Sequence, residues 1–374
     1  DHATTHARFA APLQSDIETV ARNVSGWLRS ASSTSGLPAD GAAAVAAARH
    51  ERARPVGAPF DDLAFVPNAT AGVNTVLRSL SFAPGDELLV TDHEYNACRN
   101  ALEFVATRSG ARVVTVPIPV PIASPREVHD AVVGAVTERT RLLLIDHVTS
   151  PTGVVLPVET IVAALAERGV DTLVDGAHAP GMLPLDLARL GAAYYTGNCH
   201  KWLCTPKGSA LLFVRRDRQA GIRPLSISHG ANSPRLDRSR FRLEFDFTGT
   251  DDPTPFLCVP AAIRFLSELL PGGLPALQAH NRDLAVRGRA LLNTRLGAAA
   301  LCPETMLGSL ASVLLPPGGA PLPDGADPLQ ASLFERHHVE VPVMRWPAPP
   351  LRLLRIAPQA YNSFAQIEYL AACL

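Results

Sequence analysis

Apolar residues in the middle of the chain follow two alternating patterns. Between about residues 60 and 215, short apolar runs alternate with segments whose apolar residues lie three or four positions apart. The short runs are typical of buried strands, and the three-to-four spacing is typical of amphipathic helices. The alternation predicts βαβ units and a mostly parallel sheet that is covered on both faces.

The pattern places the elements as follows. Strands are expected at residues 63–68, 87–92, 112–118, 141–148, 172–177, 192–197 and 210–216, with helices between them at 70–80, 97–108, 125–138 and 158–169. Helices at 259–270 and 274–296 come next, followed by short strands at 311–317, 339–346 and 351–358, with one helix between the first two and another at the end. The fold class is therefore predicted to be α/β, with a smaller α+β domain at the C-terminus.

Composition excludes several classes of partner. The formal net charge is -1 and no long run of one sign occurs, so neither a nucleic acid nor a membrane surface is expected as a partner. No apolar run reaches the roughly 18 residues that a spanning helix needs. The six cysteines show no CxxC or metal-type spacing, which favours reduced thiols, a cytoplasmic location and no metal site. Because the chain opens at Asp1 rather than Met, further residues are expected upstream.

Lysine is rare in this chain. Lysine and arginine together number 34, and Lys201 and Lys207 are the only lysines, which leaves 32 arginines. Arginine replaces lysine in most surface ion pairs, but a guanidinium stays protonated and cannot act as a nucleophilic amine or a base. Schiff-base chemistry requires a lysine. The two lysines are therefore candidates for a chemical role, and a chance pair of surface charges is the alternative.

Polar residues gather directly after five of the predicted strands. Ligands of an open parallel sheet lie outside the carboxyl ends of its strands. The five segments are 68–70 (NAT), 92–96 (DHEYN), 146–153 (DHVTSPTG), 175–178 (DGAH) and 196–201 (TGNCHK). We therefore expect a ligand site at this edge of the sheet.

The first of these segments suits an anion. Asn68, Ala69 and Thr70 lie where a strand turns into a helix, so the first backbone N–H groups and the Thr70 hydroxyl can hold a phosphate. Asn68 or Thr70 can equally serve as the N-cap of the helix. Both interpretations stay open on these residues alone.

Asp175 ends an apolar strand and lies 26 positions before Lys201. A carboxylate buried at that depth is costly unless a cation pairs with it, and a protonated heteroaromatic nitrogen is such a cation. His178 can hydrogen-bond a phenolic oxygen on the same ring or simply cap the next turn. An amine, a buried carboxylate and a phosphate cradle together fit pyridoxal 5′-phosphate (PLP) through its aldehyde, ring nitrogen and phosphate.

The motifs resemble a known family. Class V aminotransferases, which are fold-type I PLP-dependent enzymes, carry similar motifs in the same order as FVPNATAGVNTVLRSL, DHEYNA, DHVTSPTGVVLP, VDGAHAPG, HKWLCTPKG, FTGTDDPTPF and LRIAPQAYNS. Within the family the chain most resembles the isopenicillin N epimerase group, which is related to cysteine desulfurases and C–S lyases. The opening DHATT is similar to the start of the desulfurases but lacks the glycines often found there.

The resemblance implies a domain organisation and an assembly. It implies an aspartate aminotransferase-like fold with an N-terminal arm at residues 1–20, a large PLP-binding domain at 21–256 and a small domain at 257–374 that begins with a long linking helix. It also implies a homodimer with shared sites, in which Thr250 reaches the phosphate bound by the neighbouring subunit.

The resemblance further implies roles for single residues. Lys201 would form the Schiff base, Asp175 would pair with the ring nitrogen, and His178 would contact the ring oxygen. Arg355 would clamp the α-carboxylate of a substrate, a bidentate task that suits a guanidinium. Lys207 would have a structural or cofactor-edge role. The remaining implied contacts are those with the phosphate, from Asn68, Ala69, Thr70, Asn198 and His200, and those with the ring face, from His93 or Tyr95.

Several reactions begin with removal of a Cα proton by Lys201. Epimerisation, expected here in secondary metabolism, also needs a second acid or base, for which Tyr95, His93 and His229 are candidates. A C–S lyase acting on a cysteine conjugate or sulfoxide, and then an aminotransferase, are the alternatives. Cysteine desulfuration is disfavoured because residues 303–372, where the family's mobile nucleophile is expected, contain no cysteine. A non-catalytic PLP-fold binding protein is disfavoured by the intact lysine, aspartate and arginine.

Overall fold

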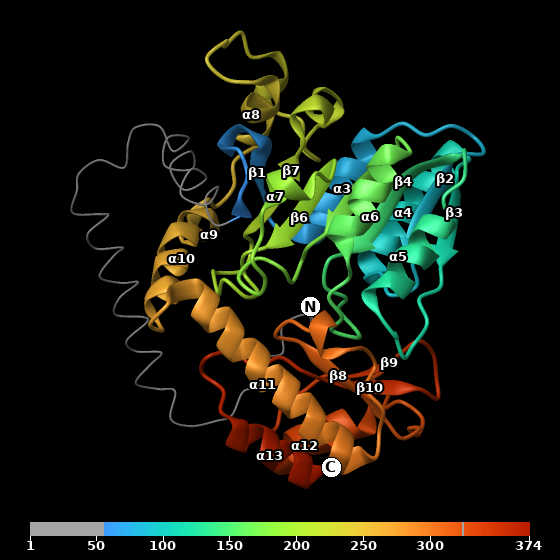
Figure 1. The fold of residues 1–374 in the computed structure, drawn as a ribbon. Helices are drawn as coiled ribbons and strands as arrows, with labels where there is room; N and C mark the ends of the chain where they lie inside the picture. The colour runs from blue at the N-terminus through green and yellow to red at the C-terminus, as the bar shows by residue number, and fades with distance from the viewer. Residues whose placement is uncertain (1–55, 324) are drawn as a thin grey trace, which may run out of the picture.

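The computed structural model describes residues 56–323 and 325–374 (Figure 1). The expected arm at residues 1–20 and the first part of the expected large domain, residues 21–55, lie outside the described residues. The described chain forms a large sheet covered by helices and a second, smaller sheet, joined by a long helix (Figure 1).

The large sheet confirms the predicted α/β class. Its strands are β1 (Leu63–Val66), β2 (Glu87–Thr91), β3 (Arg112–Val116), β4 (Thr140–Asp146), β5 (Asp171–Asp175), β6 (Tyr194–Asn198) and β7 (Ala210–Val214). They lie in the order β1-β7-β6-β5-β4-β2-β3, and β7 runs antiparallel to both of its neighbours. Each strand begins within two residues of its predicted position. Six of the seven strands are buried along almost their whole length, which leaves an unbroken apolar run, whereas the edge strand β3 is partly exposed.

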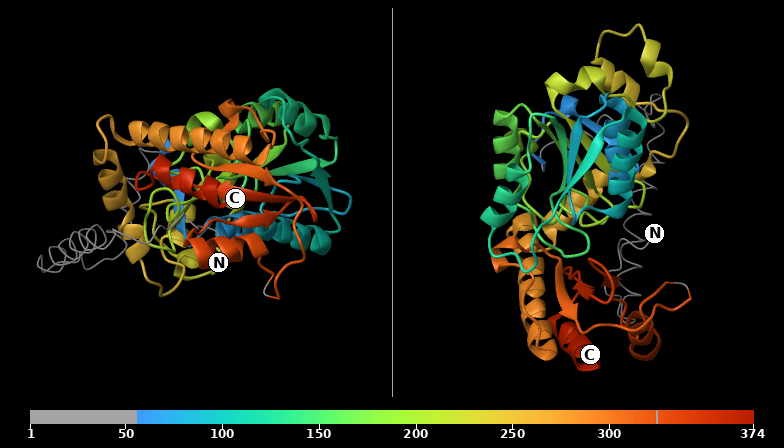
Figure 2. Two further views of the ribbon diagram at one scale, coloured as in Figure 1. Left: turned by 90° about the horizontal axis from the view of Figure 1, so that it is seen from below. Right: turned by 90° about the vertical axis from the view of Figure 1, so that its right-hand side faces the viewer.

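Helices cover both faces of this sheet. One face is covered by α3 (Ala69–Ser79) and α4 (Asn96–Ser109), and the other by α5 (Pro125–Gly134), α6 (Val158–Glu167) and α7 (Leu187–Leu190). The right view of Figure 2 shows the sheet between these two layers. Gly72 lets α3 approach β6, because a Cβ at this position would lie 2.2 Å from Oγ1 of Thr196. This close approach fixes the start of α3 beside the end of β6.

The second part of the chain is helical before it forms the small sheet. It contains α8 (Arg240–Phe245), α9 (Thr254–Leu257), α10 (Val259–Glu268) and α11 (Gly273–Leu296), and later α12 (Pro328–His337) and α13 (Phe364–Cys373). The small sheet is antiparallel in the order β8-β10-β9, with β8 at Ala311–Leu315, β10 at Arg352–Ile356 and β9 at Val343–Arg345. Short 3-10 helices lie at Phe60–Asp62, Arg216–Gly221, His229–Asn232 and Glu304–Met306.

One helix connects the two sheets. α11 packs on α10 at one end and on β8 and α13 further along (Figure 1). Within the described ranges no single helix is long and apolar enough to cross a membrane; the stretch Thr254–Glu268 passes the test of length and composition only together with α11, to which it is bent by 73°.

Candidate active site

The carboxyl edge of the large sheet surrounds a cavity of about 460 Å³. This volume is typical of sites for small molecules. Each of the five polar segments expected at this edge contributes to the lining, which includes Asn68, Ala69, Thr70, Tyr95, Asp146, Ser150, Asp175, His178, Asn198, His200 and Lys201. The topology brings them together because the parallel strands β2, β4, β5 and β6 all end here.

Lys201 lies in the loop between β6 and β7 and is 7 % exposed. Its Nζ is 3.1 Å from Nε2 of His178, which follows β5. Burial lowers the pKa of the Lys201 amine to about 8, although the carboxylate of Asp175 partly opposes this change. A neutral amine near neutral pH is what attack on an aldehyde requires.

Asp175 is the last residue of β5 and is 1 % exposed. Its Oδ1 accepts a hydrogen bond from the amide of Ala177 at 2.9 Å, and its Oδ2 accepts one from Sγ of Cys98 at 3.0 Å. Burial raises the pKa of Asp175, while the Cys98 thiol and Lys201 partly oppose this shift. The carboxylate thus has two donors, and within residues 56–323 and 325–374 no arginine or lysine forms an ion pair with it, although the charge of Lys201 acts on it. This arrangement suits a partner for a cationic ligand.

The start of α3 combines both interpretations left open by the sequence. Asn68 is the N-cap of α3, since its side chain accepts from the amide of Ala71 at 2.8 Å. The amide of Ala69 donates to Oδ1 of Asn198 at 2.8 Å, so with the Ala71 amide two first-turn donors are already used. Asn68 and Thr70 nevertheless line the cavity, and an anion can bind at this helix terminus.

His200 and Lys207 lie on the same side of the cavity. The Nδ1 of His200 is 2.9 Å from the carbonyl oxygen of Ser209, so this nitrogen donates and the tautomer is fixed. Lys207 is exposed at the cavity wall, whereas Lys201 is buried. Lys201 therefore has the burial that favours a neutral amine, which Schiff-base chemistry needs, and Lys207 does not.

Tyr95 and His93 occupy different positions. Tyr95 lines the cavity at the N-cap of α4. His93 is fully buried, with Nδ1 2.9 Å from Oγ1 of Thr152 and its ring centroid 4.6 Å from that of Trp346. Of the two candidates for the ring face, Tyr95 is the one at the cavity wall.

Arg355 lies on β10 of the small sheet and is 4 % exposed. Its Nη1 donates to the backbone oxygen and to Oγ of Ser150, a residue of the cavity wall. Its Nε has no hydrogen-bond partner among the described residues. Burial lowers the pKa of Arg355 to about 10, so the guanidinium stays charged and retains donor capacity for a carboxylate.

Comparison with known proteins assigns the chain to a family. Residues 13–315 match the family described as aminotransferase class V. The chain belongs to the class V aminotransferase family. The protein is accordingly a PLP-dependent enzyme, and the buried amine, the buried carboxylate and the helix terminus in one cavity fit this cofactor.

Three proteins that are similar to this class V chain differ in the activities that they are named for. It is 37% identical over 341 residues to an isopenicillin N epimerase from Streptomyces clavuligerus, covering 87% of this chain and 83% of that protein. It is 30% identical to a probable chloroplastic L-cysteine desulfhydrase from Arabidopsis thaliana, covering 81% and 67%. A solved structure of a C-DES variant, with glycine covalently linked to its PLP cofactor, has a TM-score of 0.72 at 23% identity and covers 88% and 84%. This last likeness confirms the fold.

Besides His93 and Arg355, two further residues predicted for the class V site lie away from the cavity lining. Thr250 is exposed in the segment after α8. His229 is also exposed, and its ring stacks on Phe247 at a centroid distance of 6.1 Å. Neither lines the cavity within the described part of this subunit.

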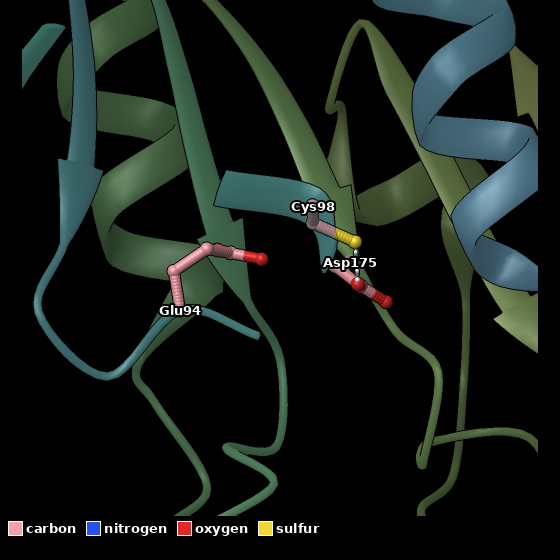
Figure 3. Close-up of side chains that lie close together, drawn as sticks. All are labelled: Glu94, Cys98 and Asp175. Atoms are coloured by element: carbon pink, nitrogen blue, oxygen red, sulfur yellow. Dashed lines mark hydrogen bonds between the residues drawn. The ribbon is translucent and has the colours of Figure 1, made fainter. Parts of the chain in front are cut away.

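Three residues to which the sequence analysis gave no role lie at the acid end of the class V site. Asp146 ends β4 directly beside Asp175 in the parallel register and lines the cavity. Glu94 and Cys98 lie close to Asp175, and Figure 3 shows their side chains converging. The sequence contained one indication that Asp146 belongs to the site, because β4 and β5 both end with aspartate after an apolar run.

Proposed function

We propose that this class V enzyme acts on an amino-acid substrate, with epimerase chemistry of the isopenicillin N epimerase type. The observation that carries the proposal is the buried amine of Lys201, with its lowered pKa, in the same cavity as the buried carboxylate of Asp175. The extent of the likeness to the Streptomyces epimerase supports this type of reaction. An amino-acid substrate is consistent with the family.

Bound PLP supplies an electron-accepting ring that stabilises the negative charge left when a Cα proton is removed. In the proposal Lys201 would hold the aldehyde end of the cofactor and would later accept that Cα proton, since its amine is neutral above about pH 8. Asp175 pairs with the ring nitrogen and His178 with the ring oxygen. The start of α3, with Asn198 and His200, holds the phosphate.

Substrate contacts in the proposal come from both sheets. Arg355 binds the α-carboxylate through donors that Ser150 leaves available. Tyr95 covers the ring and serves as the second acid or base, because it lines the cavity whereas His93 and His229 do not. A phenol with access to the cavity can return a proton to the face opposite Lys201.

A homodimer belongs to the same proposal. Thr250 is exposed and outside the cavity lining of its own subunit, which is consistent with a contact to the phosphate bound by a second copy. Light scattering of the purified protein should give the mass of two chains, and Thr250→Ala should weaken PLP binding without lowering that mass. A monomeric protein, or a Thr250→Ala variant that binds PLP as tightly as the unaltered protein, would contradict the shared site.

The two lysines provide a matched test of the covalent step. Lys201→Ala should abolish the visible absorption band of the Schiff base and reduce turnover to background, whereas Lys207→Ala should keep the band. The comparison is sharp because both side chains line one cavity. A band that persists in Lys201→Ala would exclude the proposed bond.

Isotope exchange separates the reactions. Incubation with a panel of amino acids in D2O should give deuterium at Cα and racemised product without release of ammonia. Pyruvate and ammonia released from cysteine conjugates or sulfoxides would instead favour a C–S lyase, the second candidate, which the 30% identity to the desulfhydrase supports. An absence of exchange with every member of the panel would count against both.

A further inference from the structure

Three carboxyl groups converge where β2, β4 and β5 end. Asp146 and Asp175 are paired in the parallel register, and both line the cavity. Glu94 follows β2 and is directed toward Cys98 and Asp175 in Figure 3, and one carboxylate oxygen of Glu94, one of Asp175 and Sγ of Cys98 lie within 4.8 Å of one another. One carboxyl group thus lies behind the cavity wall and two lie in it.

The hydrogen-bond donors near the cluster are unequally distributed. Asp175 accepts from the amide of Ala177 and from the thiol of Cys98. Neither oxygen of Glu94 and not Oδ2 of Asp146 accepts a hydrogen bond of good geometry within the described residues, although the Tyr95 amide lies close enough to act on both groups. Both residues are buried. A buried carboxylate without a donor is costly, and taking up a proton removes that cost. The two donors identify Asp175 as the group that is ionised.

The surrounding charges do not change this assignment. Burial raises the pKa of Glu94 well above its ordinary value, and the carboxylates of Asp146 and Asp175 raise it further, while the Tyr95 amide and Arg99 only partly oppose this. Burial and Asp175 likewise raise the pKa of Asp146, against Lys201 and the Tyr95 amide.

Two neutral groups complete the surroundings. Burial and the three carboxyl groups raise the pKa of the Cys98 thiol well above its usual range, so the thiol remains a donor to Asp175. Burial and Asp175 raise the pKa of the Tyr195 phenol in the same way. Lys201 is the one buried amine among the groups that act on the cluster in the described chain, and in the proposed enzyme its nitrogen is bound to the cofactor.

We propose that Glu94 and Asp146 each hold a proton and form, with ionised Asp175, a carboxyl cluster of one net negative charge that faces the ring nitrogen of bound PLP. Asp146 lies beside that nitrogen, and Glu94 is a positioning residue that acts through Asp175. As the pH rises, a proton lost from the cluster adds negative charge next to the nitrogen, which strengthens the nitrogen's hold on its own proton. The ring nitrogen therefore stays protonated further into the alkaline range than Asp175 alone would allow.

The protons on the cluster can be observed without cofactor. Infrared spectra of the PLP-free protein at neutral pH should contain C=O stretching bands of protonated carboxyl groups, which shift in D2O. Glu94→Gln and Asp146→Asn should each remove one such band, and Glu103→Gln, which removes an exposed carboxylate from α4, should remove none. Spectra in which neither cluster variant loses a band would overturn the proposal.

The effect on the ring rests on the proposed function and is tested separately. With PLP labelled with 15N in the ring, Glu94→Gln should lower the pH at which the bound nitrogen loses its proton by about one unit, a tenfold change in proton affinity, while Glu94→Asp restores most of it. An unchanged titration in loaded Glu94→Gln would overturn the role assigned to Glu94. If labelled PLP fails to bind at all, the proposed function fails, and the infrared bands still decide whether the cluster holds its protons.

Discussion

The two ends of the cavity differ in chemistry but respond to burial in the same sense. At the amine end, Lys201, His178 and the start of α3 offer nitrogen groups from loops and a helix terminus. At the acid end, Asp175 and Asp146 offer carboxyl groups from strand ends. Burial lowers the pKa of Lys201 and raises those of the carboxyl groups, so it favours the neutral form at both ends. A ligand with an anion at one end and a cation at the other relieves both costs at once.

Among substitutions that keep Lys201, the largest effect should come from the acid end. Asp175→Asn keeps the shape but leaves one acceptor oxygen for the two donors, Cys98 and Ala177, and removes the charge opposite the ring nitrogen. We therefore expect kcat to fall about 10²- to 10³-fold, as for loss of a preorganised electrostatic contact. Steady-state kinetics with the identified substrate measure the change. Asp171→Asn, at the opposite end of β5 and paired with Arg218 at 2.7 Å, is the matched control and should leave kcat almost unchanged.

The next effect concerns the small sheet, whose Arg355 contacts Ser150 in the cavity wall. Arg355→Lys should raise KM about 10- to 100-fold with a smaller change in kcat, because a hydrogen bond to a charged group contributes about 1.5–3 kcal/mol and lysine lacks the planar fork. Arg345→Lys on β9 changes an arginine of the neighbouring strand whose Nη2 binds the oxygen of Gly319. Equal effects of the two substitutions on KM would rule out a specific carboxylate contact.

The amine end should show its lowered pKa in the rate of cofactor attachment. With a pKa of about 8, about a tenth of Lys201 is neutral at pH 7, against roughly three in ten thousand for an unperturbed amine. The neutral fraction grows as pH rises, so the rate of Schiff-base formation with added PLP should increase about tenfold between pH 7 and 9 and then level off. Stopped-flow absorption checks this, and a rate still rising steeply above pH 9 would place the pKa of Lys201 near its ordinary value.

The smallest effect on the site should come from outside the cavity. Gly181 has φ +88°, and a Cβ there would lie 2.7 Å from the carbonyl carbon of Trp202, next to Lys201. Gly169 has φ +70° with nothing within 4 Å of such a Cβ. In urea unfolding Gly169→Ala should cost about 1–2 kcal/mol, and Gly181→Ala about 1–3 kcal/mol more. Gly181→Ala, but not Gly169→Ala, should bind PLP severalfold more weakly. Equal losses of unfolding free energy in the two variants would show that the contact with Trp202 relaxes freely.

Much of the fold was readable from the sequence because burial on both faces leaves an unbroken apolar run. β2, β5 and β7 begin at or next to their predicted residues for this reason. The polar residues directly after the strands then predicted the edge at which Lys201 and Asp175 meet, since the carboxyl ends of parallel strands share one edge. α5 ends at Gly134, before its predicted end at residue 138, because glycine weakens the helix there.

Contacts between segments that are distant in the sequence were harder to predict. His93 and Tyr95 are two positions apart after β2, and only the turn into α4 decides which side chain reaches the cavity. Asp146 belongs to the site because it lies beside Asp175 in the register of β4 and β5, and the local sequence pattern does not predict that register. The contact of Glu94 with Asp175 depends on β2 and β5 lying on either side of β4, an order that chain position does not give.

The helix α11 has a consequence for the choice of substrate. It is a single rod of 24 residues, about 36 Å long at 1.5 Å per residue, that holds the two sheets at a set separation. An amino acid bound by both Lys201 and Arg355 would span the distance between the large and the small sheet, so the length of α11 limits which molecules fit. Exchange of the bend at residues 269–272 for that of a relative should therefore change the preferred length of substrate while every group in the cavity stays the same.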